Sequence, residues 1–192
     1  MNSVLINKIC FNQIVVLVVL FAGVLTAQNP KWPQALRTYL AAVNEKDSLE
    51  TAFHHFRFLQ ETESLHTTHV QAYLGSLTAL KGKYADLPWS KVKWVKRGLA
   101  LLDEAVELAP RDPEVRFIRG STTWYLPFFF KRKDQSIADF KTILALLPVE
   151  SDDSSRQDLS NALKFIQHHI DLTPEEQQKV TIILREFAAN AE

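Results

Sequence analysis

One helix ends and another begins within the stretch Asp103-Glu104-Ala105-Val106-Glu107-Leu108-Ala109-Pro110-Arg111-Asp112-Pro113-Glu114. Pro110 ends the first helix because its ring nitrogen has no hydrogen for the next backbone bond. Asp112 and Pro113 are typical of a helix start, since the carboxylate accepts a bond from an unpaired N–H and the proline ring presets φ. A connection this short predicts that the two helices are antiparallel neighbours. The first helix carries an apolar stripe formed by Leu99, Leu102, Val106 and Ala109.

Similar apolar stripes recur at helical spacing in eight segments between Leu36 and Phe187. No segment alternates apolar and polar residues over the length that a strand needs. The 192 residues include only five glycines and eight prolines, so few positions interrupt a helix. We therefore expect an all-α fold built from antiparallel helix pairs.

A four-place pattern marks the second helix of each expected pair. It consists of a small residue, a large residue at +4, a further residue at +7 and a proline at +12. The first place has to be small because the paired helix crosses there, and the large residue fills the space between repeats. The pattern occurs as Gly98, Leu102, Ala105 and Pro110, as Ser136, Phe140, Ile143 and Pro148, and without its proline as Ala52, Phe56 and Leu59.

This pattern resembles the tetratricopeptide repeat family over roughly residues 34–148. The stretch quoted above is similar to that family's second helix and exit turn, and Ala72-Tyr73-Leu74-Gly75 and Arg119-Gly120 are similar to its first-helix signature. The resemblance implies a right-handed superhelical array of antiparallel helix pairs. The usual period of the family is about 34 residues. Here the small residues that open the pattern, Ala52, Gly98 and Ser136, are 46 and 38 positions apart, so the expected repeats are irregular.

Three units are expected along the chain: a signal peptide at 1–27, TPR-like helical repeats at 28–148, and an acidic loop with a capping helix pair at 149–192. A cap is expected because a terminal repeat otherwise leaves its apolar side in water. Thr173 and Glu176 are typical of the capped start of the last helix. The stripe expected to bury against the preceding helix consists of Val180, Ile183, Leu184 and Phe187.

The N-terminus is interpreted as an export signal. Residues 14–25 are twelve consecutive apolar residues, which fits a signal peptide and falls short of the roughly 18–20 that span a membrane. We expect cleavage near Ala27 and a periplasmic or secreted protein, with an uncleaved membrane anchor as the alternative. The single cysteine, Cys10, precedes this run, so the exported chain would have no disulfide, thiol nucleophile or cysteine metal ligand.

No catalytic, cofactor-binding or metal-binding residues are expected, and the chain is interpreted as a non-enzyme. The sequence contains no Gly-x-Ser-x-Gly elbow, phosphate-binding loop or dinucleotide fingerprint. His66 and His69 are spaced for one helix face, but no carboxylate is placed to complete a zinc site. A hydrolase ranks last among the hypotheses because the sequence suggests no nucleophile–base pair.

Charge is balanced overall but unevenly distributed. Residues 81–141 carry a net +5 and residues 142–192 a net −5. This excess is too diffuse for nucleic acid, which calls for a dense basic stripe. Two aromatic–basic segments, Trp89 to Arg97 and Phe128 to Lys133, suit a membrane surface or an anionic ligand. Alternatively, residues 128–130 fill the gap between repeats while the lysines face water.

The leading functional hypothesis is an exported scaffold that binds a protein or peptide partner through its concave face. The alternative is a peripheral membrane or cell-envelope structural protein attached through its basic aromatic region. Ala41 stands where a carboxylate-clamping member of the family has asparagine, so recognition of a free C-terminal carboxylate is not expected. The resemblance implies that the partner-binding residues include Arg37, His69, Ser76, Glu114, Phe117, Ser121 and Trp124.

Overall fold

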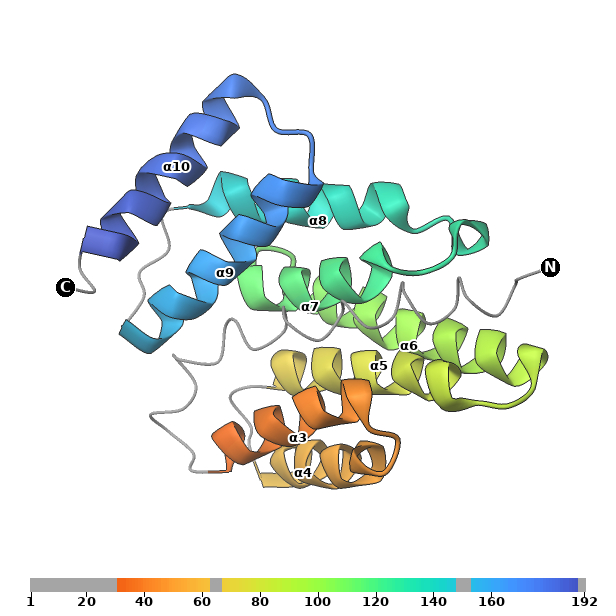
Figure 1. The fold of residues 1–192 in the computed structure, drawn as a ribbon. Coiled ribbons are helices and arrows are strands. Elements are labelled where there is room, and N and C mark those ends of the chain that lie inside the picture. Colours follow the sequence, from red (N-terminus) through yellow and green to blue (C-terminus); the bar gives the residue numbers. More distant parts are fainter. Residues whose placement is uncertain (1–30, 63–66, 148–152, 190–192) are drawn as a thin grey trace.

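The computed structural model describes residues 31–62, 67–147 and 153–189 of the chain. All regular structure in these ranges is helical, so the all-α prediction is confirmed for them (Figure 1). The expected signal peptide at 1–27 and part of the acidic loop, 149–152, lie outside the described residues. In chain order the elements are α3 (Trp32–Asn44), α4 (Ser48–Thr62), α5 (Thr67–Tyr84), α6 (Pro88–Leu108), α7 (Pro113–Trp124), a short 3-10 helix (Phe128–Phe130), α8 (Lys133–Leu146), α9 (Asp153–His169) and α10 (Pro174–Ala189).

Helix α5 is the central element of the fold, because it packs against α3, α4, α6 and α7. Its most extensive contact is with α6. The other helices also pack as consecutive pairs, α3 with α4, α7 with α8, and α9 with α10. Figure 1 shows the first three pairs stacked from α3 and α4 at the bottom to α7 and α8, with α9 running obliquely at the level of α7 and α8 and α10 at the upper left.

Two apolar cores lie between the helices. The first spans α3 to α7 and contains the stacked rings of Phe56 and Tyr73, whose centres are 4.7 Å apart. The second joins α7, α8, α9 and α10 around Phe140 and Phe165, whose ring centres are 5.6 Å apart. Aromatic pairs of this kind add about 0.5–1.5 kcal/mol beyond the burial of their area.

The contact between α5 and α6 requires glycine where the two backbones touch. A Cβ on Gly98 would lie 2.4 Å from the backbone nitrogen of Ala79 and 2.5 Å from the carbonyl oxygen of Gly75. This is closer than real Cβ atoms come to other atoms, so the expected helix crossing at this small residue is confirmed. Ser136 holds the equivalent place in α8 and is fully buried, and its hydroxyl donates to the carbonyl oxygen of Gly120 in α7.

Two of the expected helix starts are confirmed. At α7, the carboxylate of Asp112 accepts a hydrogen bond from the backbone N–H of Val115 at 3.0 Å. At α10, the Glu176 N–H donates to the Thr173 hydroxyl at 3.2 Å, and the Thr173 N–H donates to the Glu176 carboxylate at 2.8 Å. This reciprocal pair satisfies two N–H groups that an uncapped helix leaves unpaired.

Helix α10 packs against α9, as expected of a capping helix. Val180 and Ile183 are buried in the second core. Leu184 and Phe187 are only half-buried, so the expected full burial of the stripe is wrong for these two side chains. Truncating Phe187 to alanine therefore costs less than the about 3–5 kcal/mol typical of a fully buried ring.

We predict that Gly98→Ala destabilises the protein, although alanine is the better helix former. In an open helix this change raises the free energy of unfolding by up to about 1 kcal/mol. Here the added methyl group meets backbone atoms that no side-chain rotation moves aside, so we expect a fall of about 1–3 kcal/mol. Urea unfolding followed by circular dichroism measures the difference.

The matched control is Ala100→Ser, an exposed position of the same helix. It adds one heavy atom facing water and is expected to change the free energy of unfolding by about 0.5 kcal/mol or less. An unchanged or higher stability of Gly98→Ala would contradict the close crossing of α5 and α6.

Candidate functional site

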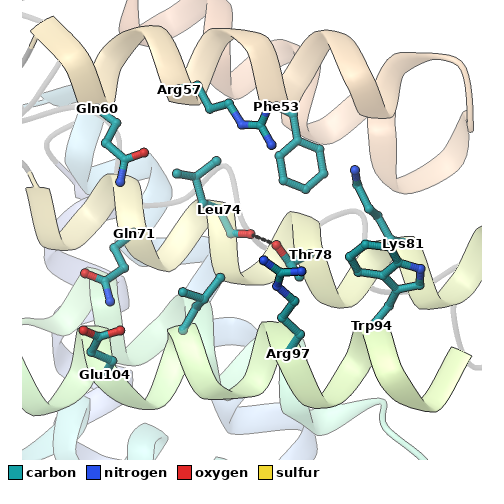
Figure 2. Close-up of a pocket in the computed structure, with 11 residues that line it drawn as sticks. Phe53, Arg57, Gln60, Gln71, Leu74, Thr78, Lys81, Trp94, Arg97 and Glu104 are labelled. Atoms are coloured by element: carbon teal, nitrogen blue, oxygen red, sulfur yellow. Dashed lines mark hydrogen bonds between the residues drawn. The ribbon is translucent and has the colours of Figure 1, made fainter. Parts of the chain in front are cut away.

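A groove of about 480 Å³ opens between α4, α5 and α6. Figure 2 shows α5 running between the other two helices, with side chains from all three turned toward the groove. We call this feature the α4–α5–α6 groove. Its lining consists of Phe53, Arg57 and Gln60 from α4, Gln71, Leu74, Thr78 and Lys81 from α5, and Trp94, Arg97, Leu101 and Glu104 from α6.

The floor of the groove is one face of α5. Its four lining residues follow each other at steps of three or four, which places them in a single row along the helix. The hydroxyl of Thr78 donates to the carbonyl oxygen of Leu74 at 2.7 Å, so this polar group is already satisfied within the helix. From Gln71 to Lys81 the row covers about 15 Å at 1.5 Å per residue.

One end of the groove combines aromatic rings with cations. The Lys81 ammonium lies 4.1 Å from the centre of the Phe53 ring and 5.5 Å from that of Trp94 (Figure 2). Arg57 lies 5.6 Å from the Phe53 ring, and Arg97 lies 5.9 Å from the Trp94 ring. Such contacts contribute about 0.5–1 kcal/mol each at exposed sites. They hold the charged groups beside the two rings.

The charge of this end is positive. Lys81 is paired with Glu50 at 2.9 Å, but the Glu50 side chain is 76% exposed, so the pair is weak and readily exchanged. Neither Arg57 nor Arg97 forms an ion pair with another residue of the described chain. Each guanidinium can therefore bind an external anion without first losing a carboxylate neighbour.

The other end of the groove is polar and carries one negative charge, the carboxylate of Glu104. Gln60 of α4, Gln71 of α5 and Glu104 of α6 line it together (Figure 2). The amide groups can both donate and accept hydrogen bonds, as the backbone of a peptide requires. The groove thus offers aromatic surface and positive charge at one end, and hydrogen-bonding groups at the other.

The residues that the family resemblance assigned to partner binding lie elsewhere. Arg37 is exposed on α3, where its Nε donates to the carbonyl oxygen of Pro33. Ser76 is on α5, but about 200° around the helix from Leu74, and thus on the side away from the groove. It is buried, and its hydroxyl lies 2.7 Å from that of Tyr39. Burial raises the pKa of Tyr39 to about 12.

Three further expected contacts, Phe117, Ser121 and Trp124, are located on α7. Phe117 and Ser121 are buried, with 1% of each residue exposed. Trp124 is half-buried and packs edge-on against Phe165 and His169 of α9. In this conformation the three side chains serve packing between α7, α8 and α9, and the partner-binding role assigned to them stays a prediction.

His69 and Glu114, the last two expected contacts, are neighbours in a partly buried polar cluster. The Nε2 of His69 lies 2.9 Å from a carboxylate oxygen of Asp112 and 3.6 Å from one of Glu114. The hydroxyl of Tyr73 donates to the other oxygen of Glu114 at 3.0 Å. The cluster joins the start of α5 to the start of α7.

A second buried charge cluster, which the sequence pattern did not indicate, joins α6, α7 and α8. Asp139 is completely buried and accepts two bonds from Arg119, at 2.7 and 2.8 Å, and one from Arg116 at 2.7 Å. Arg119 also reaches Asp103 at 3.2 Å. These arginines therefore connect α7 to α6 and α8. Removing either arginine would leave the buried carboxylate of Asp139 less well compensated.

The two aromatic–basic segments are divided between the surface and the core. Trp89 is 68% exposed, whereas Trp94 is half-buried in the groove. Phe128 is 92% exposed and Phe129 56% exposed, and only Phe130 packs against the first core. The alternative in which residues 128–130 fill the gap between repeats is thus wrong for the first two.

Comparison with protein families, with curated proteins and with solved structures finds no match for this chain. No helix in the described ranges has the length and apolar character needed to cross a membrane. Among the same residues, no group of three or more histidine, cysteine or acidic side chains is placed to hold a metal ion. His66, which was paired with His69 as a ligand spacing, lies outside the described residues.

The His69 cluster predicts a dependence of stability on pH. Burial lowers the pKa of His69, but the hydrogen bond to Asp112 and the charges of Glu114 and Asp112 outweigh it, so the pKa is raised above its ordinary 6.5. The folded state then binds the proton more tightly than the unfolded chain does. The resulting stabilisation is complete below pH 6.5 and is lost as the pH rises through the raised value.

We therefore expect the melting temperature of the parent protein to fall more steeply above about pH 6.5 than that of His69→Gln. Differential scanning calorimetry of both proteins across this range gives the comparison. The control is His54→Gln at an exposed histidine of α4, which is expected to follow the parent. Parallel curves for the parent and His69→Gln would contradict the proposed pairing of His69 with Asp112.

Proposed function

We propose that this protein is an exported, non-enzymatic scaffold of the tetratricopeptide type, and that it binds an acidic segment of a partner protein in the α4–α5–α6 groove. The observation that carries the proposal is the cationic aromatic end of the groove, where Lys81, Arg57 and Arg97 surround the rings of Phe53 and Trp94. The binding surface proposed here replaces the concave face inferred from the family resemblance.

The repeat architecture is supported by the way the helices pair. Consecutive helices pack two by two, and the first three pairs pack against each other in chain order. The pair α9–α10 shares the second apolar core with α7 and α8. The small residues Gly98 and Ser136 face the preceding helix of their own pair, as the four-place pattern requires. The right-handed superhelical path belongs to this proposal, as does export, which rests on the apolar run at 14–25.

An acidic ligand is supported by the geometry of the charges. Guanidinium groups bind carboxylates through two parallel hydrogen bonds, and Arg57 and Arg97 stand on opposite walls of the groove (Figure 2). Phe53 and Trp94 add apolar surface to the groove beside these charged positions. Floor residues covering about 15 Å accommodate about four or five residues of an extended peptide at 3.3 Å each.

Binding to an array of immobilised acidic pentapeptides tests this proposal. Each peptide has a matched partner in which Asp and Glu are replaced by Asn and Gln. Charge-assisted hydrogen bonds contribute about 1.5–3 kcal/mol, so reversing either arginine, in Arg57→Glu or Arg97→Glu, is expected to weaken binding of the acidic peptides about tenfold or more. Binding of the parent should also fall at high salt.

Two control variants distinguish the groove from other surfaces. Arg185→Glu reverses an exposed arginine on α10 and is expected to leave peptide binding unchanged. Arg37→Glu tests the surface inferred from the family resemblance. If Arg37→Glu abolishes binding while Arg57→Glu and Arg97→Glu do not, the groove is not the peptide site. Equal binding of acidic and amide peptides would contradict the acidic ligand.

A further inference from the structure

Four large apolar side chains are exposed at one end of the molecule. Leu87 and Trp89, at the α5–α6 connection, are 48% and 68% exposed, and Phe128 and Phe129, at the α7–α8 connection, are 92% and 56% exposed. Figure 1 places the two connections at the same end, on the right-hand side of the view. We call the three aromatic residues among them, Trp89, Phe128 and Phe129, the aromatic edge. Single exposed apolar residues are ordinary, but a gathering of this kind marks an interaction surface.

The backbone holds the phenylalanines of the edge outward. Residues 128–130 form one turn of 3-10 helix, which ends at Lys131 with φ 53°, in the left-handed region. The N–H of Lys131 donates to the carbonyl oxygen of Phe128 at 2.9 Å and closes the turn. A left-handed conformation is unfavourable for lysine, so the turn keeps Phe128 in water at a conformational cost.

Basic residues flank the aromatic edge on both connections. Lys93 and Lys96 follow Trp89 in the first turns of α6, and Lys131 lies two positions after Phe129, all three of them exposed. Lys133 is also exposed, and its ammonium lies over the ring of Trp124. The exposed acidic groups of the same two segments are Asp86 and Asp134. This combination suits the surface of an anionic bilayer. The apolar rings can contact the acyl chains, and the surrounding lysines can contact the phosphates of the headgroups.

We propose that the aromatic edge docks on an anionic lipid surface. Trp89, Phe128 and Phe129 enter the boundary between headgroups and acyl chains, and the lysines remain at the level of the phosphates. Each lysine near such a surface adds electrostatic attraction, which salt screens. This contact is independent of peptide binding, because the groove is lined further along α6, from Trp94 onward.

Co-sedimentation of the full chain with vesicles tests the proposal. One set of vesicles is phosphatidylcholine alone, and the other contains about 30% phosphatidylglycerol. We expect binding to the anionic set to exceed binding to the neutral set, and the difference to fall at high salt. The apolar residues 14–25 are present in every variant, so differences between variants report on the edge.

The test variant is Trp89→Ser combined with Phe128→Ser and Phe129→Ser, for which we expect a loss of vesicle affinity of about tenfold or more. A second variant, Lys93→Glu with Lys131→Glu, keeps the rings and is expected to weaken binding to anionic vesicles. The matched controls are Phe58→Ser on α4 and Ile182→Ser on α10, which remove exposed apolar side chains elsewhere and should bind as the parent does.

Three results would overturn the proposal. The first is unchanged vesicle binding by the triple serine variant, and the second is equal binding of the parent to neutral and anionic vesicles. The third concerns a different occupant. If sedimentation velocity shows a dimer of the parent that the triple variant lacks, and vesicle binding does not differ, the edge joins two copies of the chain.

Discussion

The close crossing of α5 and α6 at Gly75 and Gly98 is the constraint on which the rest of the structure depends. Because the two backbones touch there, α5 is held deep in the fold and presents its other sides to α3, α4 and α7. A second tight contact lies nearer the α5–α6 connection, where a Cβ on Gly82 would be 2.9 Å from the carbonyl oxygen of Lys91. The separation of α5 and α6 is therefore set by backbone atoms, and the shape of the α4–α5–α6 groove follows from it.

Local features of this fold are predictable from the sequence, because they depend on residues a few positions apart. The apolar period indicates the helices, and the capping residues at Asp112 and Thr173 indicate two of their starts. The small residue at Gly98 indicates a helix crossing, since no larger side chain leaves room for one. Each of these features belongs to one helix or one turn, and each prediction is confirmed within the described residues.

The candidate site was not predictable in the same way, because three separate helices form it. Gln71, Leu74 and Lys81 form a row on α5 that is visible in the sequence, but nothing in the sequence places Arg57 and Arg97 on either side of it. The buried Asp139 is a similar case, since its arginine partners are 20 and 23 positions away. A helical period predicts which face of a helix is buried. It does not predict which exposed faces of different helices lie opposite each other.

Native-state hydrogen exchange, read by NMR for each amide, tests the central role of α5 most directly. The account predicts that the slowest amides of the protein lie in α5, around Gly75 to Ala79, and exchange only through global unfolding. Helix α10, which packs at the outside of the stack, should exchange through local opening at a lower free energy. Exchange of α5 as fast as that of α10 would contradict the claim that the fold is built around the α5–α6 crossing.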